Sequence, residues 1–271
     1  MNAKLSIEKV TPSRASELLE NLFEGQRPKS DAWIKKMAQD IVQGRWRLTC
    51  DCLLLVKGKL ANGQNRLAAV VEANRPCEFI IMESNDEELY NVIDSGRKRT
   101  IGDVICKTSH YNCVASIAHW VARYDLGVIT CSTASASGGH HSKGGVRLTR
   151  SDIIEFVHKN TESLVECASL ALELYRKNGI LAPAQAGALC FIGSRKNKLA
   201  SQRFITDVYS GDSRADAAWD FREKCLKNKL SKAKFTNGMM FGLGIKCLKS
   251  YLNGTRNGNI KIADGEEFPR L

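Results

Sequence analysis

Apolar and polar positions in the first hundred residues follow the periods of short strands and short helices. An apolar run at 52–56 and a Lys-Gly-Lys turn at 57–59 predict a hairpin of buried strands. Apolar residues then recur at i, i+3 and i+4, so a helix is expected to begin near Gln64. Gly63 therefore falls at a strand-to-helix turn, with Arg66 on the first helical turn.

That turn has the features of a phosphate-binding site. The first amide groups of a helix have no partner within it, and the helix dipole is positive there. Both favour an anion, and an arginine guanidinium can donate to two of its oxygens. We expect Gly63 and Arg66 to contact phosphate. In the alternative, Gly63 only makes a tight turn and Arg66 is a surface residue, and the local pattern does not choose between the two.

Further helices are expected on both sides of the turn. One covers about residues 31–43, and Gly44 ends it. Another is expected to start at the N-cap Asn85 and to stop at Ser95-Gly96. A basic triplet at 97–99 follows, which is either a solvated corner or a second phosphate clamp.

From about residue 110 the pattern becomes helical. Caps and apolar stripes predict helices at about 110–126, after the Thr149/Asp152 cap, from Thr161 to Gly179, from Pro183, and at 235–253, with two more before the last. We therefore predict an α+β protein, in which a small mixed α/β domain at 1–108 precedes an all-helical domain at 109–252 and an extended tail at 253–271. A Gly/Ser-rich loop at about 130–147 is expected to be mobile.

Composition indicates a cytoplasmic protein with no membrane partner. The chain has 271 residues and 43% hydrophobic content, and no apolar run approaches the roughly 18 residues of a membrane span. Its first residues lack the apolar segment of a secretory signal. Ten cysteines are scattered without a Cys-x-x-Cys pair, which favours buried reduced thiols over disulfides or a zinc site.

Positive charge makes nucleic acid the leading class of partner. The net charge is +11, and basic residues cluster in the second half of the chain. Binding through the phosphate backbone is the most that this charge supports, because no base-reading motif is present. The alternative is a set of solvated helix faces. The candidate DNA-binding residues are Arg195, Lys196, Lys198, Lys224 and Lys227.

Several motifs resemble those of one family. Asn-Gly-Gln-Asn-Arg-Leu-Ala-Ala at 62–69 is similar to the Asp-Gly-Gln-His-Arg-Leu-Ala-Ala box of phage and mobile-element proteins with a ParB/sulfiredoxin-like fold. Residues 25–28 look like the early Asn-Arg-Pro segment of that family, 44–46 like its Gly-x-Trp, and 93–100 like its Ile-Asp-x-Gly-x-x-Arg element. The resemblance covers residues 12–105.

The resemblance implies a site for a nucleoside triphosphate, ATP or CTP, with Mg²⁺. Gly63, Gln64, Asn65, Arg66, Arg97, Arg99 and Arg27 are its candidate phosphate-binding residues. Asp94 is the acid that the resemblance assigns to Mg²⁺ and to catalysis. For Arg27 the alternative is an exposed loop arginine.

The departures from the family pattern bear on catalysis. Gln64 stands where sulfiredoxin has its cysteine, so sulfiredoxin chemistry is not expected. Asn62 and Asn65 replace a carboxylate and a histidine, which removes obvious groups for metal contact and proton transfer.

Three functions remain open. The first is a phage or mobile-element protein, located in the cytoplasm of a bacterial host cell, that binds a nucleotide, hydrolyses or transfers a phosphate and acts on DNA. The second is a non-catalytic DNA-binding module, and the third is a nuclease that would use Asp94 with Asp103. The helical domain is expected to bind DNA or to form a homodimer.

Overall fold

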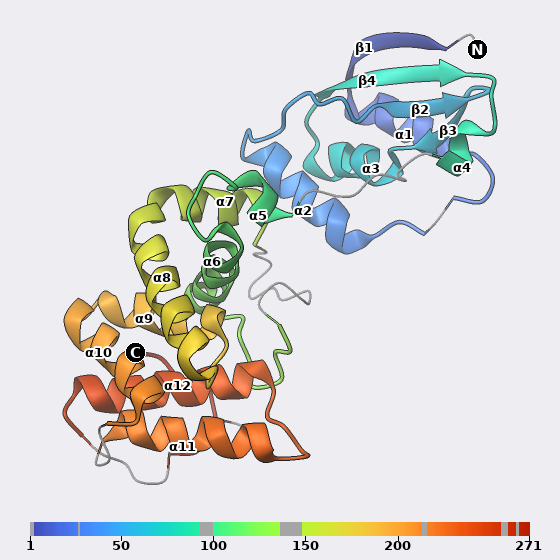
Figure 1. Cartoon of the computed structure of the whole chain (residues 1–271). Helices are drawn as coiled ribbons and strands as arrows, with labels where there is room; N and C mark the ends of the chain where they lie inside the picture. The colour runs from blue at the N-terminus through green and yellow to red at the C-terminus, as the bar shows by residue number, and fades with distance from the viewer. Residues whose placement is uncertain are drawn as a thin grey trace. The chain divides into compact units, whose positions relative to one another are not determined.

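The computed structural model describes residues 3–26, 28–92, 100–135, 148–212, 216–255, 260–263 and 266–271 (Figure 1). The chain divides into two compact units, Met1–Lys98 and Arg99–Leu271, called here the first and second units. The first contains a small mixed sheet with helices, and the described part of the second is helical. The predicted α+β class is therefore confirmed.

The first unit is organised around four strands: β1 (Lys4–Val10), β2 (Leu53–Val56), β3 (Lys59–Asn62) and β4 (Cys77–Ser84). Their order is β1-β4-β2-β3, with β2 and β4 parallel and the other pairs antiparallel. The predicted β2–β3 hairpin is confirmed. Its turn has positive φ angles at Lys57 (49°) and Gly58 (77°), which suit the twist of a tight hairpin.

Helices α1 (Pro12–Glu20), α2 (Asp31–Val42) and α3 (Gln64–Ala73) share a core with one face of the sheet. Alternate residues of β4, Phe79 and Ile81, point into this core, which the period of a strand requires. The predicted helices at 31–43 and from Gln64 are confirmed. Burying this face fixes the position of the β3–α3 turn.

The opposite face of the sheet carries a smaller cluster beside α4 (Leu89–Val92). The helix that we expected to begin after Asn85 is present but begins at Leu89, so the predicted start was wrong. Its predicted stop at Ser95-Gly96 lies outside the described residues. The Ser84 hydroxyl accepts from the Asp86 amide at 3.1 Å, and the Asp86 carboxylate accepts from the Glu88 amide at 3.0 Å. These local bonds offer the backbone an alternative to a helical turn.

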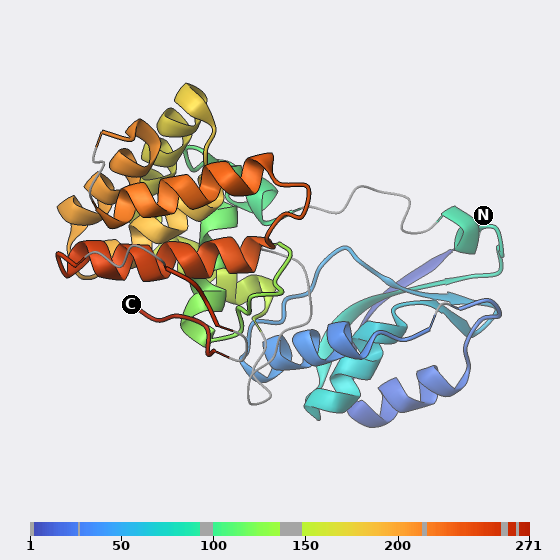
Figure 2. The same ribbon diagram turned by 90° about the horizontal axis from the view of Figure 1, so that it is seen from below.

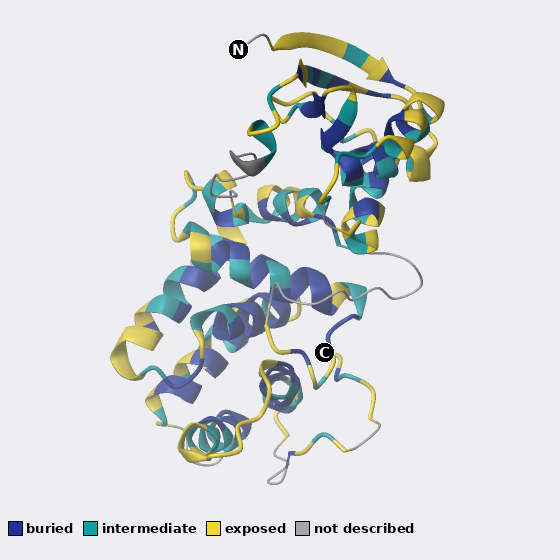
Figure 3. Cartoon of the chain, turned by 90° about the vertical axis from the view of Figure 1, so that its right-hand side faces the viewer, coloured by how far each residue is buried: buried dark blue, intermediate teal, exposed yellow. Residues whose placement is uncertain are grey.

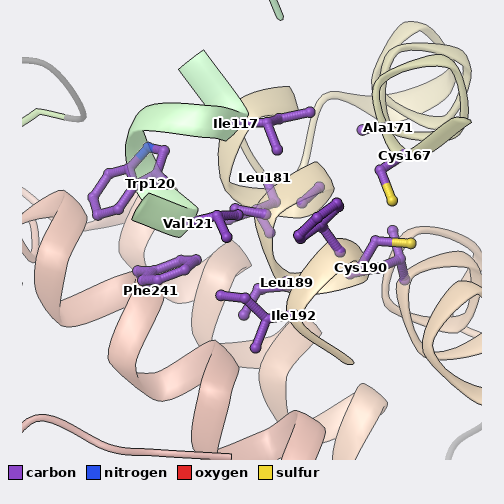
Figure 4. Packing of buried hydrophobic residues seen from close by; sticks show 14 of the residues in the cluster. Ile117, Trp120, Val121, Cys167, Ala171, Leu181, Leu189, Cys190, Ile192 and Phe241 are labelled. Carbon is purple, nitrogen blue, oxygen red and sulfur yellow. The ribbon is translucent and has the colours of Figure 1, made fainter. Parts of the chain in front are cut away.

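The helices of the second unit surround a long apolar core. They are α5 (Ile101–Val104), α6 (Tyr111–Leu126), α7 (Arg150–Lys159), α8 (Thr161–Asn178), α9 (Pro183–Ser194), α10 (Lys198–Ser210), α11 (Ala217–Leu230) and α12 (Asn237–Leu252). Helix α9 is buried along most of its length and packs against α6, α8, α10 and α12 (Figure 4). Helices α11 and α12 lie side by side (Figure 2). The caps predicted at Thr149/Asp152 and Pro183 are confirmed.

Helix α5 belongs to the second unit, although it lies within residues 1–108, the range that we predicted for the first domain. Ile105, just after it, is buried in the core of that unit, and the Arg150 guanidinium donates to the Thr100 carbonyl at 3.0 Å. Of the loop expected at about 130–147, residues 136–147 lie outside the described ranges. Its beginning is tied to α12, because the Gly238 amide donates to the Thr133 carbonyl at 2.7 Å.

The described tail folds back on this core without helix or strand. The ring of Phe268 stacks on Phe241, and the Arg270 guanidinium lies over the Tyr124 ring at 4.5 Å. No helix in the described ranges combines the length and apolar character that crossing a bilayer requires.

Candidate phosphate-binding site

Gly63 adopts a backbone conformation that other residues rarely take. Its φ is 106° and its ψ is 6°, at the N-cap of α3. A Cβ atom here would lie 2.2 Å from Cδ2 of Leu53, a buried residue of β2. Backbone strain and this close approach both require glycine, with or without a bound ligand. The tight turn and its packing therefore explain the glycine at position 63 without a bound phosphate.

Arg66 joins the first turn of α3 to the segment that enters β2. Its Nη2 donates to the Cys52 carbonyl at 2.8 Å, and its Nη1 donates to the Asp51 carbonyl. The guanidinium fork thus holds two backbone oxygens 14 and 15 residues earlier in the chain. Arg66 therefore helps to fix the conformation of the turn that we predicted as a phosphate site. This structural role is separate from the predicted contact of Arg66 with phosphate.

Gln64 and Asn65 are the other predicted residues of the turn. Gln64 is buried, with 5% of its surface exposed. The Asn65 Oδ1 accepts a hydrogen bond from the Ser30 amide at 3.0 Å. Ser30 is the N-cap of α2, so the N-terminal ends of α2 and α3 meet at Asn65. This contact between positions 30 and 65 gives no signal in the sequence.

A loop before α2 completes the surroundings of the turn. The side-chain Nε2 of Gln26 donates to the carbonyls of Leu60 and Ala61, at 2.8 and 2.7 Å. The Phe23 amide donates to the same Leu60 carbonyl at 3.0 Å. The loop therefore follows β3 up to the turn. Arg27, the residue after Gln26, lies outside the described residues.

The second predicted phosphate element is not part of the described structure. Asp94, Arg97 and Arg99 all lie within 93–99, outside the described ranges. Asp103, the second acid of the nuclease hypothesis, accepts from the Thr100 amide at 2.6 Å and closes a capping box. Among the residues that the structure describes, no group of three His, Cys, Asp or Glu side chains is placed to hold a metal ion.

The basic residues predicted to bind DNA fall into two groups. Arg195 forms a bidentate ion pair with Asp125, at 2.6 and 2.7 Å, which raises the pKa of Arg195. Lys198 pairs with Glu166 at 2.6 Å. Their partners come from earlier helices, so the sequence cluster did not reveal them. The side chains of Lys196 and Lys227 are exposed and Lys224 is half-buried, all in the second unit.

Charge is distributed unequally between the units. Residues 1–98 contain 15 Lys and Arg against 14 Asp and Glu, whereas residues 99–271 contain 25 against 15. Nearly all of the net charge of +11 therefore belongs to the second unit. An electrostatic surface for nucleic acid is expected there rather than on the first unit.

Comparisons with protein-family models, with curated proteins and with solved structures gave no match to this chain.

Proposed function

We propose that this chain is a ParB/sulfiredoxin-like protein of the phage or mobile-element type that binds a nucleoside triphosphate and acts on DNA. The phosphates bind at the turn between β3 and α3, and the second unit contacts the DNA backbone. The observation that carries this proposal is the meeting of two helix N-termini, marked by the hydrogen bond between Asn65 and Ser30. Two positive dipole ends beside one turn favour an anion more than one does.

Arg66 has a positioning role in this proposal. By holding the carbonyls of Asp51 and Cys52, it keeps its positive charge within the first turn of α3. A phosphate at the helix N-terminus would then be close to a charge whose orientation is already set. Transfer of a phosphoryl group requires mainly such positioning and neutralisation of charge. Asp94 is the acid that the family resemblance assigns to Mg²⁺, which would supply neutralisation of the phosphate charge.

A calorimetric titration with ATP, CTP, GTP and UTP, each with Mg²⁺, tests the proposal. We expect the wild-type chain to bind at least one of them. The informative variant is Asn65→Asp, because its carboxylate still accepts from the Ser30 amide and suits a helix N-terminus. It should fold normally but bind the nucleotide at least tenfold more weakly, since it places a negative charge beside the phosphate.

Arg66→Ala and Arg75→Ala form a matched pair for the same titration. Arg75 follows the other end of α3 and also donates to a backbone carbonyl, that of Val42, at 2.8 Å. Loss of binding in Arg66→Ala but not in Arg75→Ala would support the site. Equal affinity of the wild type and Asn65→Asp would remove it.

A non-catalytic DNA-binding module is the second candidate. Both terminal nitrogens of Arg66 are bonded to backbone carbonyls, and Asn65 is a hydrogen-bond acceptor rather than a titratable base. Both observations favour a site that holds a phosphate without reacting with it. In this case the turn would hold a phosphate of DNA, and Asn65→Asp would weaken DNA binding while no free nucleotide binds.

A further inference from the structure

Strand β1 lies at the edge of the sheet and exposes apolar side chains to solvent. Among the residues that the structure describes, it pairs with β4 alone, and Leu5 and Ile7 are 66% and 67% exposed. The two side chains lie on the same face of the strand because they are two residues apart. Val10, on the other face, is buried in the core beneath the sheet. Figure 3 shows β1 exposed along most of its length.

This apolar strip continues onto the next strand. Leu5 lies opposite Met82 of β4, and Ile7 lies opposite Ile80, both of which are half-buried. The strip faces away from α1 and α3 and adjoins the smaller cluster of the first unit. It therefore extends the apolar surface of the sheet to its outermost strand.

The outer edge of β1 has neither a proline nor a bulge to prevent pairing. Exposed edge strands are normally blocked by proline, by a bulge, by a covering segment or by charged side chains. Of these devices, the described part of the chain gives β1 only the charges of Lys4, Glu8 and Lys9. The pairing of β1 with β4 runs without a shift from Lys4 to Val10, and the strand contains no proline. Within the described residues, no backbone hydrogen bond reaches β1 from a segment other than β4.

We propose that two copies of this chain pair through β1, antiparallel, about a twofold axis at Ser6. In this register Lys4 lies opposite Glu8 of the second copy, and Glu8 opposite its Lys4. Leu5 likewise lies opposite Ile7 of the second copy. Directly opposed residues of antiparallel strands project to the same face, so charges meet charges and apolar side chains meet apolar side chains.

The charges of β1 favour this register, and they favour a second copy of the chain as the partner, because Lys4 of each copy meets Glu8 of the other. An axis at Ile7 would place Leu5 opposite Lys9 and Ser6 opposite Glu8, and neither pair is complementary. Glu8 already accepts from Arg14 of its own chain at 3.3 Å, and a carboxylate can accept from a second cation as well. The pairing is closed, because the same edge is used by both copies, and it joins two sheets into one.

Sedimentation equilibrium of the full chain over a range of concentrations tests the proposal. We expect a concentration-dependent dimer for the wild type. Ile7→Lys should raise the dissociation constant at least tenfold, because it places two lysines beside the apolar strip. The matched control is Leu199→Lys on α10, where the side chain is 78% exposed and the dimer should be unchanged.

A charge exchange tests the register itself. Lys4→Glu and Glu8→Lys should each weaken the dimer, since each places like charges opposite one another. The double variant should recover most of the wild-type affinity. A monomeric wild type would overturn the proposal. It would do so even if β1 pairs with a strand of another protein. A dimer insensitive to Ile7→Lys, or no recovery in the double variant, would also overturn it.

Discussion

The side chain of Leu53 fills the space that a Cβ atom at Gly63 would need, since the two atoms would lie only 2.2 Å apart. Leu53 is fully buried in β2, and Gly63 begins α3 with a φ of 106°. The strand and the helix are therefore packed as closely at this turn as glycine allows. Any substitution at Gly63 must displace Leu53 or move α3.

Gly63→Ala should destabilise the first unit by about 2–5 kcal/mol. Strain at positive φ contributes about 1–2 kcal/mol, and overpacking against Leu53 contributes about 1–3 kcal/mol. The matched control is Gly58→Ala, where φ is 77° but no atom lies within 4 Å of the new Cβ. Urea unfolding should show a larger loss for Gly63→Ala, and equal losses would contradict the role of Leu53.

Cysteine reactivity should follow burial and pH. Cys50 and Cys106 are exposed, whereas burial raises the pKa of Cys113 to about 11 and that of Cys225 to about 12. Since the thiolate is the reactive form, Cys50 and Cys106 should be alkylated by iodoacetamide at neutral pH. Cys113 should react only as the pH approaches about 11. Mass-spectrometric mapping of the labelled peptides checks this order, and early labelling of Cys113 would contradict it.

DNA binding should depend on the exposed lysines more than on the paired cations. Lys227→Gln should weaken binding uniformly across sequences and reduce the slope of log affinity against log salt by about 1. Arg195→Gln should change the affinity less, because its guanidinium is bonded to Asp125. Fluorescence anisotropy with a duplex at several salt concentrations measures both. A larger effect of Arg195→Gln would place the DNA surface at α9 instead.

Local signals in the sequence predicted the starts of several helices. The Thr149/Asp152 capping box and Pro183 set the starts of two helices through residues within three positions of one another. Asn85 failed as a cap because two neighbours, Ser84 and Asp86, bond to the same stretch of backbone. Adjacent polar side chains compete for the same backbone amides, and the residue types alone do not show which of them forms the hydrogen bond.

The surroundings of the candidate site depend on contacts distant in sequence. The position of Gly63 at a strand-to-helix turn was predictable from the apolar pattern, and α3 begins at Gln64. The bond from Ser30 to Asn65 was not predictable, because it joins separate helices across 35 positions. The pairing of Arg195 with Asp125, 70 residues apart, was hidden for the same reason.

The most direct test of the phosphate site is an NMR titration of the ¹⁵N-labelled chain with ATP or CTP in the presence of Mg²⁺. We expect the amide resonances of Gln64, Asn65 and Arg66 to shift, because the phosphate would accept hydrogen bonds at the N-terminus of α3. The amides at 71–73, at the other end of the helix, should not move. Shifts confined to other parts of the chain, or none at saturating nucleotide, would contradict the assignment of this turn as a phosphate-binding site.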